Sequence, residues 1–181
     1  MKNEHMQPWI LAGYELFADD GPQGLKVEVI SRKVKKSKSS FYHHFADLEV
    51  FIEYLLDYHL ERAKIIAQRE GSCKNINPEL INVLIDVKQD LLFNRQLRIN
   101  RSVESFNNCF EKSNKLVGEA ILMLWAKEIE LSDNLSIAQV VLGLVLENFY
   151  LQITKKTLTF DWLLNYFKEI QLMVSGIKKT D

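Results

Sequence analysis

A short basic segment at residues 21–46 contains the side chains of this sequence with the clearest chemical role. Their positive charges could bind a polyanion. Its six cations face one anion, Glu28, whereas the whole chain has a net charge of −1. A basic segment on an otherwise acidic chain is typical of a small part that meets a polyanion. A solvated charged face would show the same excess of charge. The cations are Lys26, Arg32, Lys33, Lys35, Lys36 and Lys38.

Catalytic and metal-binding patterns are absent from the sequence. It contains no phosphate-binding loop, dinucleotide-binding glycine motif, nucleophile elbow or zinc-peptidase motif. None of the four histidines follows a glutamate by three positions, as in carboxylate-bridged metal bundles. Cys73 and Cys109 lack a C-x-x-C spacing, which indicates free thiols. We therefore predict no enzyme, no cofactor and no metal site.

Composition and proline placement predict an all-α fold. Hydrophobic residues make up 47% of the 181 residues, and no proline follows Pro78, so the later chain lacks the strongest helix breaker. No stretch alternates between apolar and polar residues as a half-buried strand would. The opening residues precede no apolar run suited to a signal peptide, and the richest later run, 137–151, is interrupted by Glu147 and Asn148. We expect a soluble, cytoplasmic protein without a membrane segment.

Helical patterns place the basic segment on two short helices. A first helix is predicted over 8–19, and a second over 27–34. Lys35 and Lys36 then form a turn with Ser37, whose hydroxyl suits an N-cap of a helix over 38–45. Asp47 is the predicted N-cap of a longer helix that reaches about residue 68.

The rest of the chain is predicted to be helical after a loop at 71–78. Polar residues set the predicted boundaries, with interruptions at Asn94 and at Ser113 and Asn114. About nine helices result for the whole chain. The later ones are predicted over 79–93, 95–110, 113–130, 137–155 and 160–178.

The last two predicted helices carry too many apolar side chains for surface helices. The helix near 137–155 is apolar almost all round, and the helix near 160–178 has a wide apolar stripe at helical spacing. Two such helices from each of two chains would form a four-helix interface with two-fold symmetry. The alternative is that both are internal core helices.

Two short helices joined by a three-residue turn have the layout of a helix-turn-helix. The second helix would lie in the major groove of DNA. Phe41 and Phe45, four residues apart, would then face inward. Hydrogen-bonding side chains would face the groove, with Tyr42 and His44 suited to phosphate. The outward set is Lys38, Ser39, Ser40, Tyr42 and His43.

About the first 56 residues resemble the TetR family of transcriptional regulators. Residues 10–21 resemble the family's first helix with its terminal glycine, and residues 30–45 resemble its helix-turn-helix, which ends in Tyr42-His43-His44-Phe45. The resemblance implies a three-helix DNA-binding domain at 1–47 and a larger helical effector-binding and dimerisation domain at 48–181. It also implies a ligand-responsive repressor that binds a palindromic operator as a homodimer.

Carried over residue by residue, the resemblance implies contacts to double-stranded DNA. Lys38 would reach guanine O6 and N7, and His43 stands where many members place a base contact. For each residue the alternative is a solvent-exposed side chain that binds nothing. The predicted DNA-binding set is Arg32, Lys35, Lys36, Ser37, Lys38, Ser39, Ser40, Tyr42, His43 and His44.

The resemblance also implies an effector pocket among the middle helices, for a small apolar or amphipathic molecule. Aromatic and polarizable side chains on those helices are the predicted lining. Such residues at helical spacing are also typical of plain core. The candidates are Phe106, Cys109, Phe110, Met123, Trp125, Phe149 and Tyr150.

Three positions depart from the family pattern. Lys35 and Lys36 stand where the family has glycine and an apolar residue, so a lysine is expected in the left-handed region at a cost of ~1 kcal/mol. Burial of the Lys36 ammonium would be unfavourable unless its stem points outward. Leu48 stands where the family often has a lysine for phosphate. A degenerate protein-interaction module without specific DNA binding is therefore the alternative function.

Overall fold

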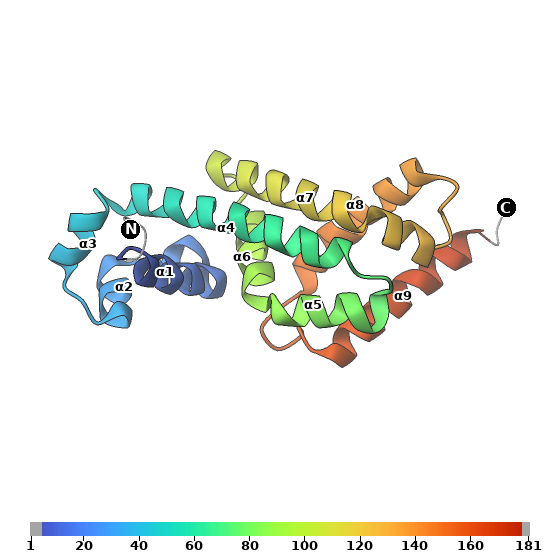
Figure 1. The fold of residues 1–181 in the computed structure, drawn as a ribbon, viewed down its shortest axis with the longest axis horizontal. Coiled ribbons are helices and arrows are strands. Elements are labelled where there is room, and N and C mark those ends of the chain that lie inside the picture. The colour runs from blue at the N-terminus through green and yellow to red at the C-terminus, as the bar shows by residue number, and fades with distance from the viewer. Residues whose placement is uncertain (1–4, 179–181) are drawn as a thin grey trace. The chain divides into compact units, whose positions relative to one another are not determined.

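The predicted all-α fold is confirmed. The computed structural model describes residues 5–178, and over this range it contains nine α-helices and no strand (Figure 1). A 3-10 turn (Gly21–Gly24) follows the first helix, and a π turn (Ile76–Leu80) precedes the fifth. The helices are α1 (Gln7–Asp20), α2 (Val27–Val34), α3 (Lys38–His44), α4 (Leu48–Gly71), α5 (Ile81–Asp86), α6 (Lys88–Ile99), α7 (Glu104–Glu128), α8 (Leu135–Gln152) and α9 (Phe160–Lys178).

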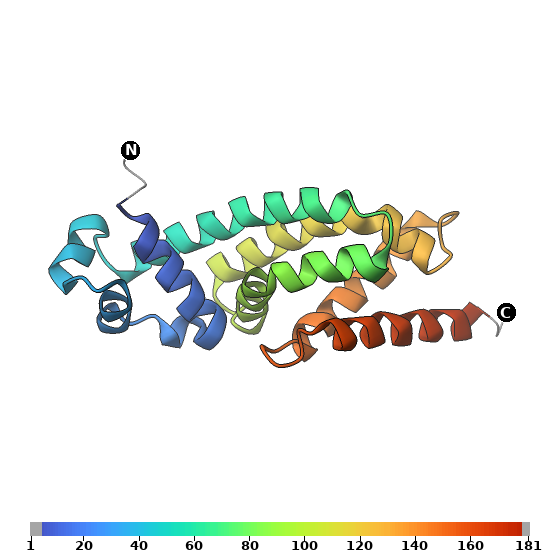
Figure 2. The same ribbon diagram turned by 60° about the horizontal axis from the view of Figure 1, so that its bottom comes forward.

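The described chain packs as two compact units. The first unit comprises residues 5–62 and 89–113, and therefore α1 to α3, most of α4, nearly all of α6 and the start of α7. The second unit comprises residues 63–88 and 114–178, with the end of α4, α5, most of α7, α8 and α9 (Figure 2). Two long helices, α4 and α7, thus contribute to both units.

The first four helices lie within three residues of their predicted bounds, and the two predicted N-caps are confirmed. The Ser37 hydroxyl accepts the Ser40 backbone N–H at 3.2 Å, and the Asp47 carboxylate accepts that of Val50 at 2.8 Å. Each cap satisfies a backbone donor that lacks a partner in the first turn of its helix. Gly21 ends α1 with a φ of 68°, a conformation that costs glycine little.

The predicted helices at 79–93, 95–110 and 113–130 have the wrong boundaries. The chain breaks at Val87 and at residues 100–103, and α7 continues through the predicted interruption at Ser113. Asn94 and Ser113 are both buried, and the Ser113 hydroxyl oxygen lies 2.7 Å from Asn94 Oδ1. Because each polar side chain finds a partner inside the fold, neither has to end a helix.

An aromatic core holds α3 in the first unit. Trp9 of α1, Phe41 of α3 and Phe51 of α4 are fully buried. The Phe41 ring lies 5.6 Å from the Trp9 ring and 5.2 Å from the Phe51 ring, both edge to face. Gly13 lets α1 and α4 approach closely, since a Cβ there would lie 2.4 Å from the end of the Phe51 ring. Helix α3 is thus fixed by large rings on two other helices.

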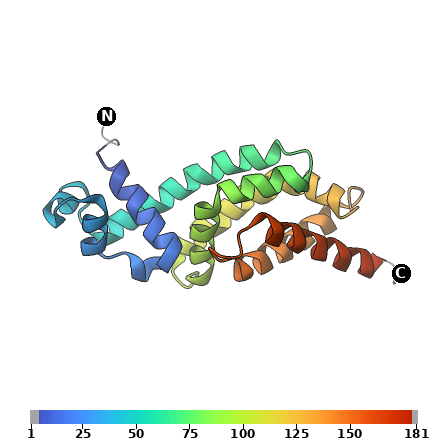
Figure 3. The same cartoon turned by 90° about the horizontal axis from the view of Figure 1, so that it is seen from below.

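In the second unit α8 and α9 lie side by side (Figure 3). Phe149 of α8 and Leu163 of α9 are buried, but large apolar side chains of both helices remain exposed. Among residues 5–178, α8 is the helix whose length and apolar composition would allow it to cross a membrane, a test that a soluble protein's core helix also passes. The exposed set is Leu135, Ile137, Val140, Leu144, Leu151, Leu172 and Met173.

Candidate nucleic-acid interface

The turn between α2 and α3 contains the predicted left-handed lysine. Lys35 has a φ of 58° and a ψ of 42°. Its backbone N–H donates to Arg32 O at 3.1 Å, and the Lys36 N–H donates to Ser31 O at 3.0 Å. These two bonds form the Schellman motif that ends many helices. The left-handed residue of this motif, here Lys35, is usually glycine. Lys36 is exposed, so its ammonium is not buried under the turn.

Replacing Lys35 with glycine should therefore stabilise the fold. A non-glycine residue in the left-handed region costs roughly 1 kcal/mol, which exceeds the extra chain entropy that glycine loses on folding. We expect Lys35→Gly to raise the free energy of unfolding by up to about 1 kcal/mol in urea denaturation. Lys36→Gly, next to it at an exposed position with φ outside the left-handed region, is the matched control and should destabilise. If the two substitutions changed the free energy of unfolding equally, the left-handed backbone of Lys35 would not be the source of strain.

Helix α3 divides into a buried and an exposed side, as the sequence predicts. Phe41 and Phe45 are buried, with ring centroids 5.0 Å apart. Tyr42 is 54% exposed, so its hydroxyl and part of its ring face solvent. Of the predicted DNA-binding set, Ser40 and His44 are half-buried and the others are exposed. These others are Arg32, Lys35, Lys36, Ser37, Lys38, Ser39, Tyr42 and His43.

His44 is turned partly toward α1. Its ring lies 6.4 Å from the Trp9 ring and 5.4 Å from the His43 ring. Burial lowers the pKa of His44, and electrostatic interactions with His43 and Lys36 lower it further. The imidazole is therefore mostly neutral at neutral pH, so it would meet a phosphate as a hydrogen-bonding group.

Two ion pairs cross the helices of this surface. Lys33 Nζ lies 3.1 Å from Glu15 Oε2, which joins α2 to α1. The Lys38 ammonium donates to Glu28 Oε1, which joins α3 to α2. The hydrogen bond from Lys38 is the main cause of a lowered pKa of Glu28, so Glu28 is ionised at neutral pH. The first residue of α3 thus has its charge partner within the protein.

The predicted effector-pocket residues fall in two separate groups. Phe106, Cys109 and Phe110 are buried in the first unit, where the Phe106 ring lies 5.4 Å from the Phe17 ring. Burial raises the pKa of the Cys109 thiol to about 12, so this cysteine is an unreactive core residue.

The other four candidates lie in the second unit. Trp125, Phe149 and Tyr150 are buried, and Trp125 Nε1 donates to Ala138 O at 3.2 Å. Met123 is 63% exposed.

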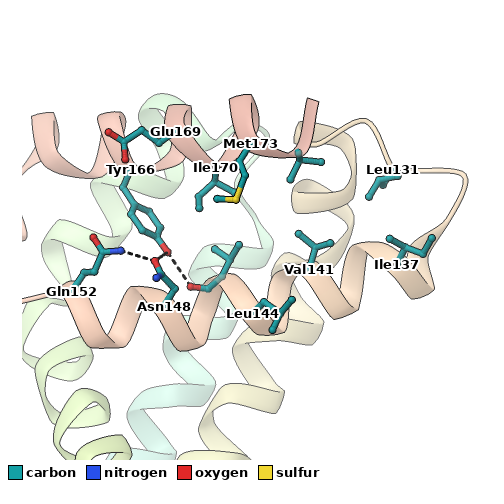
Figure 4. Close-up of a pocket in the computed structure, with 12 residues that line it drawn as sticks. Leu131, Ile137, Val141, Leu144, Asn148, Gln152, Tyr166, Glu169, Ile170 and Met173 are labelled. Atoms are coloured by element: carbon teal, nitrogen blue, oxygen red, sulfur yellow. Dashed lines mark hydrogen bonds between the residues drawn. The ribbon is translucent and has the colours of Figure 1, made fainter. Parts of the chain in front are cut away.

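A groove in the second unit is lined by none of the predicted effector-pocket residues. It lies between α8 and α9 and has a volume of about 610 Å³ (Figure 4). Tyr166 of α9 points across it toward α8, with its hydroxyl donating to Val145 O at 2.9 Å and 3.2 Å from Asn148 Oδ1. Most of the wall is apolar. The lining residues are Leu131, Ile137, Val141, Leu144, Val145, Asn148, Gln152, Tyr166, Glu169, Ile170, Met173 and Val174.

A buried polar network anchors α1 within the first unit. The Tyr14 hydroxyl donates to Asp90 Oδ1 at 2.9 Å and lies 2.7 Å from His59 Nδ1. Arg62 donates to both oxygens of Asp90, at 2.9 and 2.8 Å. Burial lowers the pKa of His59 to about 4 and raises that of Tyr14, so both are neutral. The network ties α1, which packs on α3, to α4 and α6.

The second unit contains a buried carboxyl group with one oxygen that lacks a hydrogen-bond partner among the described residues. Glu70, in the last turn of α4, is 2% exposed, and its Oε2 has no partner in the part of the chain that the structure describes. Burial raises the pKa of Glu70 to about 8, against a smaller lowering by Arg69. Over residues 5–178, no three histidine, cysteine or acidic side chains gather in a way that could hold a metal ion.

Comparison with known proteins gives a match at the level of structure. No model of a protein family matches the sequence, and no curated protein is significantly similar to it. A structure from Rhodococcus sp. assigned to the TetR family of transcriptional regulators matches with a TM-score of 0.57 at 18% identity, covering 98% of each chain. A second TetR-family structure, from Mesorhizobium loti MAFF303099, matches with a TM-score of 0.62 at 15% identity, covering 98% of each chain.

A third similar structure is Salmonella enterica GusR. It has a TM-score of 0.60 at 14% identity, and the match covers 97% of this chain and 95% of that one. The identities are low, so the match concerns the path of the backbone. The chain has the all-helical fold of TetR-family transcriptional regulators.

Proposed function

We propose that this protein is a DNA-binding transcriptional regulator, a repressor that binds a palindromic operator as a homodimer and responds to a small molecule. The observation that carries the proposal is α3. This helix is capped by Ser37 and held by buried rings, and it presents lysine, serine, tyrosine and histidine side chains to solvent. Such an array offers hydrogen bonds to base edges and phosphates. The function implies a cytoplasmic protein that meets DNA directly.

The departures at the turn do not remove the elements that DNA binding needs. The turn forms with Lys35 in the left-handed region, and Lys36 adds an exposed positive charge beside α3. Leu48 is half-buried at the start of α4, so the phosphate contact often made there would fall to neighbouring lysines. These features favour specific DNA binding over a degenerate interaction module.

Substitution on the exposed side of α3 tests this function. Tyr42 and His43 are exposed, so Tyr42→Ala with His43→Ala should leave thermal unfolding nearly unchanged. Loss of two DNA contacts should weaken binding to the preferred duplex by at least about tenfold, at roughly 1–3 kcal/mol per specific contact. Lys36→Gln removes an exposed lysine beside α3 and should reduce the dependence of log affinity on log salt by ~0.9. Unchanged binding by both variants would assign the interface to another surface.

We propose that α8 and α9 form the dimer interface. Exposed apolar side chains cover these helices, with Leu144 68% and Leu172 73% exposed, and the groove between them continues this surface. An apolar surface of this kind is usually covered by another protein surface, and a second copy would satisfy two-fold symmetry. The alternative of two internal core helices leaves the exposed side chains without a role.

The oligomeric state tests the interface. A charge buried in an apolar dimer interface is costly, so Leu144→Glu should convert a dimer to a monomer in sedimentation at micromolar concentration. Ile65→Glu is the matched control, because Ile65 is an apolar residue of α4 that is 49% exposed. It should leave the dimer intact. A dimer that survives Leu144→Glu would place the interface elsewhere.

The effector is proposed to be a small apolar or amphipathic molecule bound in the helical body. Its proposed contacts are one of the two groups predicted from the sequence, either Phe106, Cys109 and Phe110 in the first unit or Trp125, Phe149 and Tyr150 in the second. Met123 is the weakest member because it is exposed. The exposed groove between α8 and α9 belongs to the proposed dimer interface instead.

A further inference from the structure

Three of the four histidines of the chain lie near one lysine at the surface that the proposed function assigns to DNA. His43 and His44 are neighbours on α3, with ring centroids 5.4 Å apart. Lys36, in the turn before α3, and His5, just before α1, also act electrostatically on His44. His44 is half-buried and the other three side chains are exposed. We call these four side chains the histidine cluster.

The free protein disfavours a positive charge on His44. Partial burial lowers the pKa of its imidazole, and electrostatic interactions with His43, Lys36 and His5 lower it further. These three neighbours are all basic, so protonation of one imidazole opposes protonation of the next. The His44 imidazole is therefore mostly without its second proton at neutral pH when no DNA is bound.

Bound DNA would reverse the sign of this electrostatic effect. A duplex brings phosphate charges to the same surface, and nearby negative charge favours the protonated form of an imidazole. This effect does not depend on which acceptor each ring meets, because the phosphates act through their combined field. A group whose pKa rises on binding takes up protons, and by linkage the complex is then more stable at lower pH.

We propose that the histidine cluster couples DNA binding to the uptake of protons from solvent at the imidazole nitrogens, so that the affinity for DNA rises as the pH falls from 8 to 6. This inference rests on the proposed function, because it requires α3 to meet DNA. A lysine such as Lys36 is charged throughout this range, whereas histidines gain their charge within it. The cluster thus makes the strength of DNA binding depend on pH.

Fluorescence anisotropy with the full chain at pH 6 and pH 8 tests the inference, on the preferred genomic duplex and on a random duplex of equal length. The slope of log affinity against pH equals the number of protons taken up. An average uptake of about one-third of a proton tightens binding roughly fivefold at pH 6, and about two-thirds of a proton tightens it roughly 20-fold. We expect a tightening between these two values on both duplexes. The salt dependence should also be steeper at pH 6, by up to ~0.9 for each added imidazolium.

His43→Gln combined with His44→Gln identifies the histidines of α3 as the source. The ratio of the affinities at pH 6 and pH 8 is compared within each variant, so the loss of a neutral contact cancels. This ratio should fall to about twofold or less in the double variant. Tyr42→Ala is the matched control, because Tyr42 is an exposed neighbour on α3 and tyrosine ordinarily titrates well above this range. It should weaken binding and keep the ratio. His43→Gln alone, at an exposed position, should lower the ratio in part if the double variant fails to fold.

Two other titrating groups do not account for the expected effect. His59 is buried with a pKa of about 4, so it stays neutral between pH 6 and pH 8. Glu70 has a pKa of about 8, but it belongs to the second unit and is present in every variant. The difference between the double variant and the unaltered chain therefore isolates the contribution of His43 and His44.

Calorimetry measures the protons directly. Binding at pH 6.5 in PIPES and in Bis-Tris, two buffers that differ in their enthalpy of ionisation, should give enthalpies that differ in the sense of proton uptake. The difference should be smaller for the double variant. Equal enthalpies in the two buffers for the unaltered chain would overturn the inference. So would an affinity ratio between pH 6 and pH 8 that is the same in the double variant and the unaltered chain.

Failure of the proposed function gives a different result. A chain without sequence-specific binding would show no preference between the two duplexes, and proton uptake on both of them would still support the histidine cluster. A chain that prefers the genomic duplex equally at both pH values, with no change of affinity, would support the proposed function and overturn the inference. A chain that binds neither duplex at either pH would overturn both.

Discussion

Arg62→Met is expected to destabilise the protein by about 2–4 kcal/mol, because it leaves the Asp90 carboxylate buried without a countercharge. Asp90 is 5% exposed, and Arg62 makes two hydrogen bonds to it. Methionine keeps most of the side-chain volume, so loss of packing contributes little. For a chain of this length the midpoint of thermal unfolding should fall by roughly 5–15 °C.

Two further variants separate the buried charge from a general effect. Arg69→Met breaks the exposed pair of Arg69 and Asp86, whose side chains are 40% and 62% exposed, and should cost less than about 1 kcal/mol. Adding Asp90→Asn to Arg62→Met removes the unpaired charge and should recover part of the loss. If Arg62→Met destabilised the protein no more than Arg69→Met, the buried pair of Arg62 and Asp90 would not stabilise the first unit.

Glu70→Gln is expected to stabilise the protein at alkaline pH. Glu70 is buried and has a pKa of about 8, against an ordinary value of 4.5. Below pH 4.5 the group is protonated in both folded and unfolded chains, so its contribution is then fully present. As the pH rises, the unfolded chain ionises first, and stability is lost progressively until the folded-state pKa of about 8 is passed.

The expected size of this effect is large. Each unit of pKa difference corresponds to about 1.4 kcal/mol, and local relaxation reduces the total to roughly 2–4 kcal/mol. Urea denaturation at pH 5 and pH 8.5 should show the unaltered chain losing this much relative to Glu70→Gln. Glu53→Gln, at an exposed position of the same helix, should follow the unaltered chain. If the free energy of unfolding changed with pH in the same way for Glu70→Gln and the unaltered chain, Glu70 would not be a buried neutral carboxyl group.

The helices of the proposed DNA interface could be predicted from local features of the sequence. Ser37 and Asp47 cap the helices that they were expected to cap. Phe41 and Phe45 face the core because their spacing of four places them on one side of a helix. The left-handed lysine followed from its place in the turn, and the structure confirms it at Lys35.

The helix boundaries in the middle of the chain depend on hydrogen-bond partners that are far apart in the sequence. Asn94 and Ser113 have the residue types of helix interruptions, yet each is buried and they hydrogen-bond to each other across 19 residues of sequence. Tyr14 and Asp90 are 76 residues apart. No local pattern shows such a pair, because it forms only when α1 and α6 pack together.

The groove between α8 and α9 could not be predicted from the sequence either. The two apolar helices were predicted, with bounds close to those observed, but which side chains face each other depends on their crossing. Aromatic and sulfur-containing residues were expected to line a pocket because of their type. In the folded chain most of them are buried core, and the groove is lined mainly by aliphatic side chains.

Binding of the full chain to genomic DNA tests most directly whether α3 reads sequence. Fragments that include the region around its own gene should compete with random duplex at several salt concentrations. We predict a roughly palindromic site bound at least about 10³-fold more tightly than random duplex, with log affinity falling against log salt by ~0.9 per phosphate contacted. Affinity for every fragment that equals the affinity for random duplex would contradict the account and favour an interaction module without specific DNA binding.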